Sequence, residues 1–383
     1  MGFVARKAER TPPPVADIAM PPDNPAVIEW DSVSDGVALD LSLGFAAVSL
    51  VDPAKGEPLM TRVTGVRRQL SRELGFVIPQ VRVRDDMTLP PNRYRLSVHG
   101  VVTAQGDVWP DQMLAIDTGD TLSPIEGRAT KDPTFGADAV WIAAPLRAEA
   151  IVAGYTVVDA ATVVATHFHT MLQAAASQLF GLDEAQKLLD VLKERAPQLS
   201  SALTPAPFQL ADVAVVCRGL LAEGVPVRDF VRICEAMLEA SCEDPLHGDL
   251  IERVRQRIGS IIVQAICGDA PLRVMTLDSG LEGLLAQSLR TGQGATHPIE
   301  PGFGERLTRA IVDAARAHQT DDAALALVTS PTSRRALRKL VAAAMHDLPV
   351  LSYLEIPDGK EIEIVTIVGD PVGSPPAIEH AHA

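Results

Sequence analysis

The stretch VAVVCRGLLAEGVPVRDFVRICEAML, residues 213–238, carries two apolar stripes at helical spacing on either side of Gly224. The members of each stripe recur every three or four residues, so they fall on one face of an α-helix, and a glycine between them is typical of a helix end. The same periodicity extends over residues 183–265, which we therefore predict to be wholly helical. The stripes consist of Val213, Val216, Cys217, Leu220 and Leu221, and of Phe230, Ile233, Cys234, Met237 and Leu238.

Strands and helices alternate on both sides of this helical stretch, which indicates a mixed α/β protein. Before it, the patterns predict helices over residues 59–74 and 161–179 and strands over residues 80–84 and 94–102. After it, they predict strands over 272–277, 324–328, 350–356 and 361–368, with helices over 281–289, 303–318 and 333–346. Ser333 is the expected cap of the last helix, and Pro357-Asp358-Gly359 is expected to join the last two strands by a turn.

Composition excludes several classes of protein. The chain has 383 residues and a net charge of -15, which disfavours binding to nucleic acid or to anionic lipid, because both need a basic surface. The hydrophobic fraction of 47% is ample for folded cores, and no apolar run reaches the ~18 residues that a membrane-spanning helix needs. The four cysteines form no CxxC pair and lie in apolar helical stretches, so we expect buried free thiols.

Motifs of catalysis and cofactor binding are missing from the sequence. It has no GxxxxGK[ST] loop, no GxGxxG after a strand and no GxSxG elbow. His167 and His169 lie in a predicted helix, where residues two apart point about 200° away from each other and cannot hold one metal ion. Asp85-Asp86 at a strand end is more typical of a turn than of acid–base chemistry. We therefore predict that the protein is not an enzyme and needs no cofactor or metal.

Two local features suit contact with another protein. Arg67 and Arg68, with Arg72, form a basic face on a predicted helix, and this face is either simply solvated or contacts an acidic patch of a partner. Asp132-Pro133-Thr134-Phe135-Gly136 places an aromatic ring beside a carboxylate within a turn-rich segment. The ring of Phe135 is either the anchor of a small core or an exposed binding hot spot.

Six blocks of the sequence, in the same order, resemble the FlhA (FHIPEP) family of type III export-gate proteins. The resemblance covers about residues 29–368, and the block AGYTVVDAATVVATHFHTML is the most specific. The blocks are LGFVIPQVRVRDDMTLPPNRYRLSVHGV (74–101), KDPTFGADAVWI (131–142), AGYTVVDAATVVATHFHTML (153–172), LFGLDEAQKLLD (179–190), LLAEGVPVRDFVRICEAM (220–237) and DLPVLSYLEIPDGKEIEIV (347–365).

The resemblance implies the C-terminal cytoplasmic part of an inner-membrane protein, divided into four subdomains. The first, second and fourth are expected to be mixed α/β and the third all-helical. The implied organisation is a linker from the membrane region (1–35), a first subdomain (36–110 plus 160–180), an inserted second subdomain (111–159), a helical third subdomain (181–265), an α/β fourth subdomain (266–368) and a flexible tail (369–383).

In function, the resemblance implies a docking platform on the cytoplasmic face of the bacterial inner membrane. Nine copies are expected to form a ring that receives flagellar export chaperones with their bound substrates, components of the export ATPase complex and other export-gate proteins. The alternative is the homologous gate component of a virulence injectisome, which has the same fold and different cargo.

The resemblance also implies a chaperone site in a cleft between the first two subdomains. The family's binding positions match Asp132, Phe135, Thr166 and Ile116, with Gly136 beside the ring. The sequence departs from the family pattern at Thr118 and Ala137, which bears on the depth of the pocket. The implied inter-subunit contact of the linker falls on Trp30 and Asp31.

Overall fold

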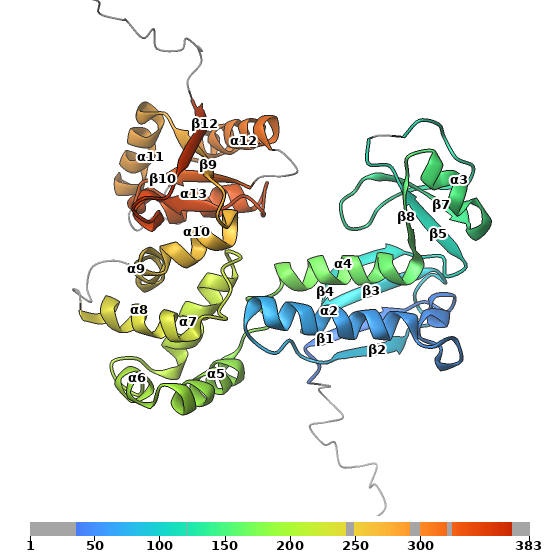
Figure 1. Cartoon of the computed structure of the whole chain (residues 1–383), viewed down its shortest axis with the longest axis horizontal. Coiled ribbons are helices and arrows are strands. Elements are labelled where there is room, and N and C mark those ends of the chain that lie inside the picture. The colour runs from blue at the N-terminus through green and yellow to red at the C-terminus, as the bar shows by residue number, and fades with distance from the viewer. Residues whose placement is uncertain (1–35, 120, 243–248, 292–298, 320–323, 370–383) are drawn as a thin grey trace, which may run out of the picture. The chain divides into compact units, whose positions relative to one another are not determined.

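A computed structural model describes residues 36–119, 121–242, 249–291, 299–319 and 324–369. These residues form three four-stranded sheets together with helices, so the predicted mixed α/β class is confirmed (Figure 1). Within the described residues, no helix is both long and apolar enough to cross a membrane. The residues from Ala38 onward belong to one compact unit, so the division into four subdomains remains a prediction.

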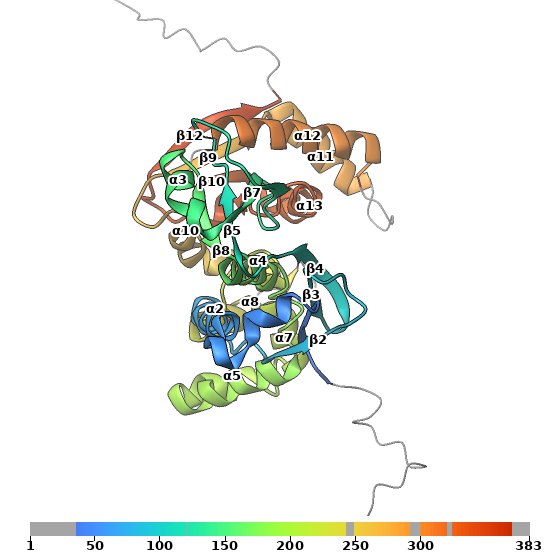
Figure 2. The same cartoon turned by 90° about the vertical axis from the view of Figure 1, so that its right-hand side faces the viewer.

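The first sheet has the strand order β2-β1-β3-β4. Its central strand β1 is parallel to β2 and antiparallel to β3. Helices α2 and α4 lie side by side against this sheet in both views (Figures 1 and 2). The bounds are β1 Leu39–Leu43, α2 Pro58–Leu74, β2 Val81–Asp85, β3 Arg93–Val98, β4 Val101–Asp107 and α4 Ala160–Ala174, with short 3-10 turns at Ala47–Val51 and Pro53–Lys55.

The predicted single strand over residues 94–102 is wrong. The chain reverses at His99-Gly100, where both residues have positive φ (48° and 79°), and the segment becomes the antiparallel hairpin β3–β4. A two-residue turn of this kind matches the right-handed twist of the flanking strands. The helix predicted over 161–179 also ends early, because the chain leaves the helical path after Ala174.

The second sheet, with the order β6-β7-β5-β8, is built entirely from the segment that the sequence marked as an insertion. All neighbouring strands in it are antiparallel. The bounds are β5 Gln112–Ile116, β6 Arg128–Lys131, β7 Asp138–Ala143, α3 Arg147–Val152 and β8 Thr156–Asp159, with a 3-10 turn at Ala144–Leu146.

The helical stretch is confirmed. Within its described residues, every regular element between Leu182 and Cys267 is a helix, and nine of the ten stripe residues are buried, Leu238 being half-buried. The bounds are α5 Leu182–Arg195, α6 Pro197–Leu203, α7 Leu210–Leu221, α8 Phe230–Cys242, α9 Leu250–Arg257 and α10 Gly259–Cys267.

The cysteines differ in exposure. Cys217 and Cys234 are buried, and burial raises the pKa of the Cys217 thiol to about 12. Cys242 is exposed and Cys267 is half-buried, so the expectation that all four thiols are buried is wrong. Cys242 is the last residue of α8.

The third sheet is fully parallel and has the order β11-β10-β9-β12. The two strands that flank Pro357-Asp358-Gly359 therefore lie at opposite edges of the sheet and do not form a hairpin. Strand β11 also ends at Ser352, because the Glu355 carboxylate accepts hydrogen bonds from the backbone N–H and hydroxyl of Ser352 and closes a 3-10 turn. The bounds are β9 Leu272–Leu277, α11 Ser279–Thr291, α12 Pro301–His318, β10 Leu325–Thr329, α13 Pro331–Ala342, β11 Val350–Ser352, η4 Tyr353–Glu355 and β12 Ile362–Val368.

The cap of α13 is Ser330 and not Ser333. Helix α13 begins at Pro331, whose fixed φ suits a first helical position, so Ser333 falls inside the first turn and is buried. The sequence prediction placed the cap three residues too late and the helix start two residues too late.

A buried cluster of charges joins α13 to the helical stretch. The fully buried Arg334 guanidinium donates to the Glu223 carboxylate (Nη1–Oε2 2.5 Å) and to the Glu252 carboxylate (Nε–Oε2 2.6 Å). Arg255 pairs with Glu355 (Nη2–Oε2 2.7 Å). These charges come from four separate elements of the chain, so the cluster ties these elements together.

Candidate functional site

The segment that carries Phe135 is the tight turn between β6 and β7. The backbone N–H of Asp132 donates to the carbonyl of Ala137 (2.8 Å), and the N–H of Gly136 donates to the carbonyl of Asp132 (2.9 Å). Gly136 has a φ of +72°, a left-handed conformation that glycine adopts without strain. The glycine therefore allows the chain to turn sharply after the aromatic residue.

Asp132 shapes this turn from inside. Asp132 is only 4% exposed, and its Oδ2 accepts hydrogen bonds from the backbone N–H groups of Phe135 (2.7 Å) and Thr134 (3.1 Å). The structure gives Oδ2 an internal role, which is to fix the turn that holds Phe135.

The ring of Phe135 projects from the turn and is 77% exposed. This exposure rules out the small-core anchor, one of the two interpretations open from the sequence, and the other, an exposed binding hot spot, remains a prediction. An exposed phenyl group on a turn fixed by hydrogen bonds is preorganised for contact, because little conformational freedom is left to lose on binding.

The other predicted site residues lie on neighbouring elements. Ile116, at the end of β5, is half-buried, pairs with Ala139 of β7 and packs on the main apolar core. Thr166 is half-buried on α4. Trp30 and Asp31 lie outside the described residues. Whether these residues bind a chaperone together remains a prediction.

A hydrogen-bonded pair next to Thr166 was not anticipated, in which Tyr94 is buried and His167 is half-buried. The hydroxyl of Tyr94 on β3 and Nδ1 of His167 are hydrogen-bonded at 2.7 Å, and the two rings meet edge to face with centroids 5.8 Å apart. Burial lowers the pKa of His167, while the negative charge of Asp132 acts in the opposite direction. Burial, and then the charges of Asp132 and Asp107, raise the pKa of Tyr94 far above its ordinary value.

The sequence signal for Tyr94 was weak, since an inward-facing tyrosine in an alternating strand looks like any core residue. Both histidines lie on α4, as predicted. Among the described residues, no group of three or more histidine, cysteine or acidic side chains is arranged to hold a metal ion.

The predicted basic face on α2 divides into two parts. The guanidinium of Arg67 donates to the backbone carbonyls of Pro79 (2.8 Å) and Ile78 (2.9 Å), so it holds the chain after α2 in place. Arg68 is exposed, and so is Arg72 one turn further on. Contact between this face and a partner remains a prediction, and it now depends on Arg68 and Arg72.

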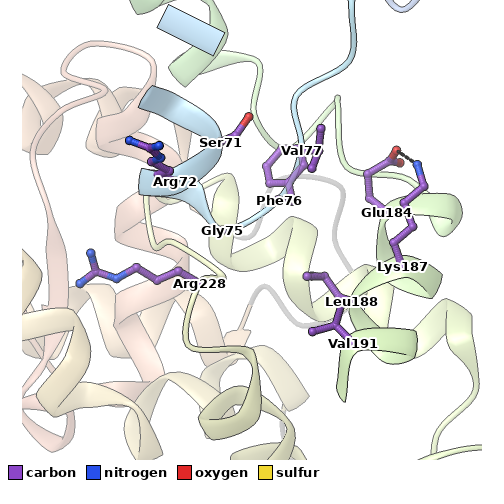
Figure 3. A pocket seen from close by; sticks show the side chains of 10 residues that line it. All are labelled: Ser71, Arg72, Gly75, Phe76, Val77, Glu184, Lys187, Leu188, Val191 and Arg228. Carbon is purple, nitrogen blue, oxygen red and sulfur yellow. Dashed lines mark ion pairs between the residues drawn. The ribbon is translucent and has the colours of Figure 1, made fainter. Parts of the chain in front are cut away.

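Arg72 also lines a groove of about 350 Å³ between the end of α2 and α5 (Figure 3). Phe76 lies at this groove and packs edge to face on Phe180, with ring centroids 5.2 Å apart. None of the predicted chaperone-site residues lines it. The lining residues are Ser71, Arg72, Gly75, Phe76, Val77, Glu184, Lys187, Leu188, Val191 and Arg228.

Solved structures share this fold. The chain is similar to the CdsV protein in the structure of the Chlamydia pneumoniae CdsV and CdsO protein complex, with a TM-score of 0.73 and 19% identity over 87% of this chain and 97% of that chain. It is also similar to the nonameric EscV cytosolic domain from the type III secretion system, with a TM-score of 0.65 and 17% identity over 88% and 98% of the two chains. The fold is therefore that of the cytosolic domains of such secretion-system proteins.

The sequence comparisons are more specific. The FHIPEP family matches residues 6–361. The flagellar biosynthesis protein FlhA of Salmonella typhimurium is 35% identical over 369 residues, which are 95% of this chain and 52% of that protein. The chain belongs to the FHIPEP family, as the six sequence blocks predicted, and it spans about half the length of the curated relatives it matches.

Proposed function

We propose that the chain is the cytoplasmic docking platform of a flagellar type III export gate. It binds chaperone–substrate complexes and export-ATPase components at the inner membrane. In this way it sets the order in which the substrates are secreted. The observation that carries this proposal is the exposed Phe135 ring, held on a turn by the buried Asp132 carboxylate, at the two positions for which the family resemblance implies a binding role.

The chemistry of the turn suits an apolar helix face of a chaperone. An aromatic anchor contributes much of the binding energy where a helix docks on an apolar surface. The half-buried Ile116 on β5 and Thr166 on α4 are proposed to add apolar and hydroxyl contacts. Cargo must be released after delivery, so we expect a Kd on the order of micromolar, about -8 kcal/mol. The basic side chains of Arg68 and Arg72 suit an acidic patch on a second partner.

Two solved relatives support the wider assembly. CdsV has been solved in a complex with CdsO, and the EscV domain is nonameric. We infer a ring of nine copies for this chain too, with the segment of Trp30 and Asp31 reaching a neighbouring copy. The chain acts by binding and not by catalysis.

The flagellar branch is favoured over an injectisome by sequence identity. The chain is 34–35% identical to FlhA proteins from Salmonella typhimurium and Bacillus subtilis, against 17% for the EscV cytosolic domain from the type III secretion system. Calorimetric titration of the purified chain with flagellar and with injectisome chaperone–substrate complexes tests this choice. Binding of the flagellar complexes alone is expected, and binding of neither class would overturn the proposal.

A further inference from the structure

Strand β12 forms one edge of the third sheet, next to β9 (Figure 1). This sheet is fully parallel, and parallel sheets are normally covered on both faces, because their strands are apolar on both sides. Three isoleucines of β12 depart from this rule, with Ile362 46% exposed, Ile364 64% and Ile367 51%. Burying these side chains would be favourable, so the edge is suited to contact with another chain.

The register with β9 places all three isoleucines on one face of the sheet. Their partners in β9 are alternate residues, and alternate residues of a strand point to the same face. A bulge at Val365 keeps Ile367 in phase with the other two. The pairs are Ile362 with Leu272, Ile364 with Val274 and Ile367 with Thr276. The isoleucines therefore form one apolar stripe along the edge.

The cover of this face ends at β9. Leu272 and Val274 of β9 are buried in one core with Ile262 and Val263 of α10, which packs on β9. None of the three isoleucines belongs to that core or to another core of the described residues. The stripe is thus an uncovered continuation of a face that is buried one strand further in.

The backbone of β12 is open on the same edge. Residues 362–368 pair with β9 on one side, and no described strand pairs with them on the other. Sheet edges are usually protected by proline, by charged side chains, by a bulge or by a covering element. The protection within β12 consists of the bulge at Val365 and the charge of Glu363. An added strand can therefore hydrogen-bond to this edge.

Acidic side chains alternate with the isoleucines. Glu361 precedes Ile362, and Glu363 lies between Ile362 and Ile364, on the opposite face of the strand. The side chain of Glu363 is 59% exposed, and its ion pair with Arg273 is long (Nε–Oε2 3.7 Å). An added strand would therefore meet aliphatic groups on one face and a carboxylate on the other.

We propose that β12 is a docking edge for an extended segment of another protein in which aliphatic and basic residues alternate. The aliphatic residues of that segment are buried on the isoleucine stripe, and a basic residue pairs with Glu363. Both are favourable cross-strand pairs. The net charge of -15 also attracts a basic partner.

A second copy of the chain fits this edge poorly. Two paired β12 strands would bring Glu361 and Glu363 of both copies together, and residues 361–368 contain no basic residue to compensate them. Like charges on paired strands are destabilising. The charge pattern therefore favours a different, basic protein.

Fluorescence anisotropy with a short labelled peptide of alternating valine and lysine tests the proposal on the whole chain. We expect this peptide to bind and a peptide of alternating valine and glutamate not to bind. N-methylation of the peptide backbone removes the donors that pair with a sheet edge and should abolish binding. Equal binding of the N-methylated peptide would overturn strand pairing, and no binding of the valine–lysine peptide would overturn the proposal.

Substitutions in β12 assign the site. Ile364→Lys should weaken binding about tenfold or more, because it sets a cation against the apolar side of a basic segment, and Glu363→Gln should weaken it about twofold to fivefold, the size of one cross-strand pair. Val101→Lys is the matched control, because Val101 is an exposed valine at the start of the edge strand β4. Circular dichroism checks that each variant is folded. Equal weakening by Val101→Lys would reveal general charge repulsion and overturn the assignment.

Hydrogen–deuterium exchange locates the bound peptide. Slower exchange of the amides of residues 362–368 is expected, and slower exchange elsewhere without this change would overturn the proposal. Sedimentation of the unaltered chain and of Ile364→Lys examines the second-copy alternative. Self-association that Ile364→Lys abolishes would assign the edge to a second copy and would also overturn the proposal.

The inference does not depend on the proposed function, and the two can fail separately. Phe135→Ala should bind the valine–lysine peptide like the unaltered chain. Peptide binding without binding of any chaperone complex leaves the docking edge standing and overturns the function. Binding of chaperone complexes without peptide binding leaves the function standing and overturns the docking edge.

Discussion

Replacing Arg334 with methionine tests the buried charge cluster most severely. The side chain is 0% exposed and donates to the carboxylates of Glu223 and Glu252, which are themselves largely buried. Methionine fills similar space but removes the hydrogen bonds that both carboxylates accept, and it leaves Glu223 with Arg255 alone as an ion-pair partner (Nη1–Oε2 3.3 Å). Removing one partner of a buried ion pair costs about 3–5 kcal/mol, so the variant is expected to lose that much of its free energy of unfolding.

The loss can be measured by urea denaturation and by thermal scans followed by circular dichroism. For domains of comparable size, 1 kcal/mol shifts Tm by about 2–4 °C, which predicts a fall of about 6–20 °C. Arg335→Met is the matched control, because Arg335 is the next residue on α13, is half exposed and pairs with Asp249. A pair this exposed is worth at most about 1 kcal/mol.

Two further outcomes identify the mechanism. Adding Glu223→Gln and Glu252→Gln to Arg334→Met should recover part of the lost stability, because the uncompensated charges are gone. Burial alone raises the pKa of Glu223, but the hydrogen bond from Arg334 and the nearby guanidinium charges lower it overall. Without Arg334 burial prevails, the folded-state pKa rises, and the deficit shrinks toward acid pH. A deficit no larger than that of Arg335→Met would refute the reasoning.

Three more predictions follow from local geometry. Gly259→Ala should lower the free energy of unfolding in urea by about 1–3 kcal/mol, because the added Cβ would lie 2.1 Å from the Glu355 carbonyl oxygen. Gly65→Ala, in open space within α2, should raise it by up to about 1 kcal/mol. Labelling with a thiol reagent should modify the exposed Cys242 well before the buried cysteines, which should react only on unfolding. Asp132→Ala should cost about 1 kcal/mol and speed amide exchange in the Phe135 turn, while Asp132→Asn, which can still accept hydrogen bonds, should do less.

Much of the fold could be predicted from local pattern. The apolar stripes of the helical stretch and the alternation of the apolar strands predicted their elements correctly, because the period of each pattern matches the face that the element buries. Strand β6 escaped notice because its side chains are polar and mostly exposed, so it shows no apolar alternation. The hairpin at His99-Gly100 was missed because the alternating pattern continues almost unbroken through the turn.

Long-range arrangement was less predictable. A turn sequence such as Pro357-Asp358-Gly359 specifies a local reversal but not which strands become neighbours, and here β11 and β12 lie at opposite edges. The partners of Arg334 lie 111 and 82 residues away in sequence, so no local pattern could reveal the cluster.

The candidate site was predicted in part. The sequence marked the turn around Phe135 as unusual, and family resemblance singled out the same residues. The sequence could not show that Asp132 is buried or that Tyr94 and His167 are hydrogen-bonded to each other, because these facts depend on how the strands and α4 pack.

The affinity of flagellar chaperone–substrate complexes for Phe135→Ala, compared with Phe45→Ala, tests the docking account most directly. Phe45 is the matched control, because its ring is 71% exposed but lies on another part of the chain, after β1. The account predicts a loss of about 2 kcal/mol, about 30-fold in Kd, for Phe135→Ala and an unchanged Kd for Phe45→Ala. Equal binding by Phe135→Ala and the unaltered chain would contradict it.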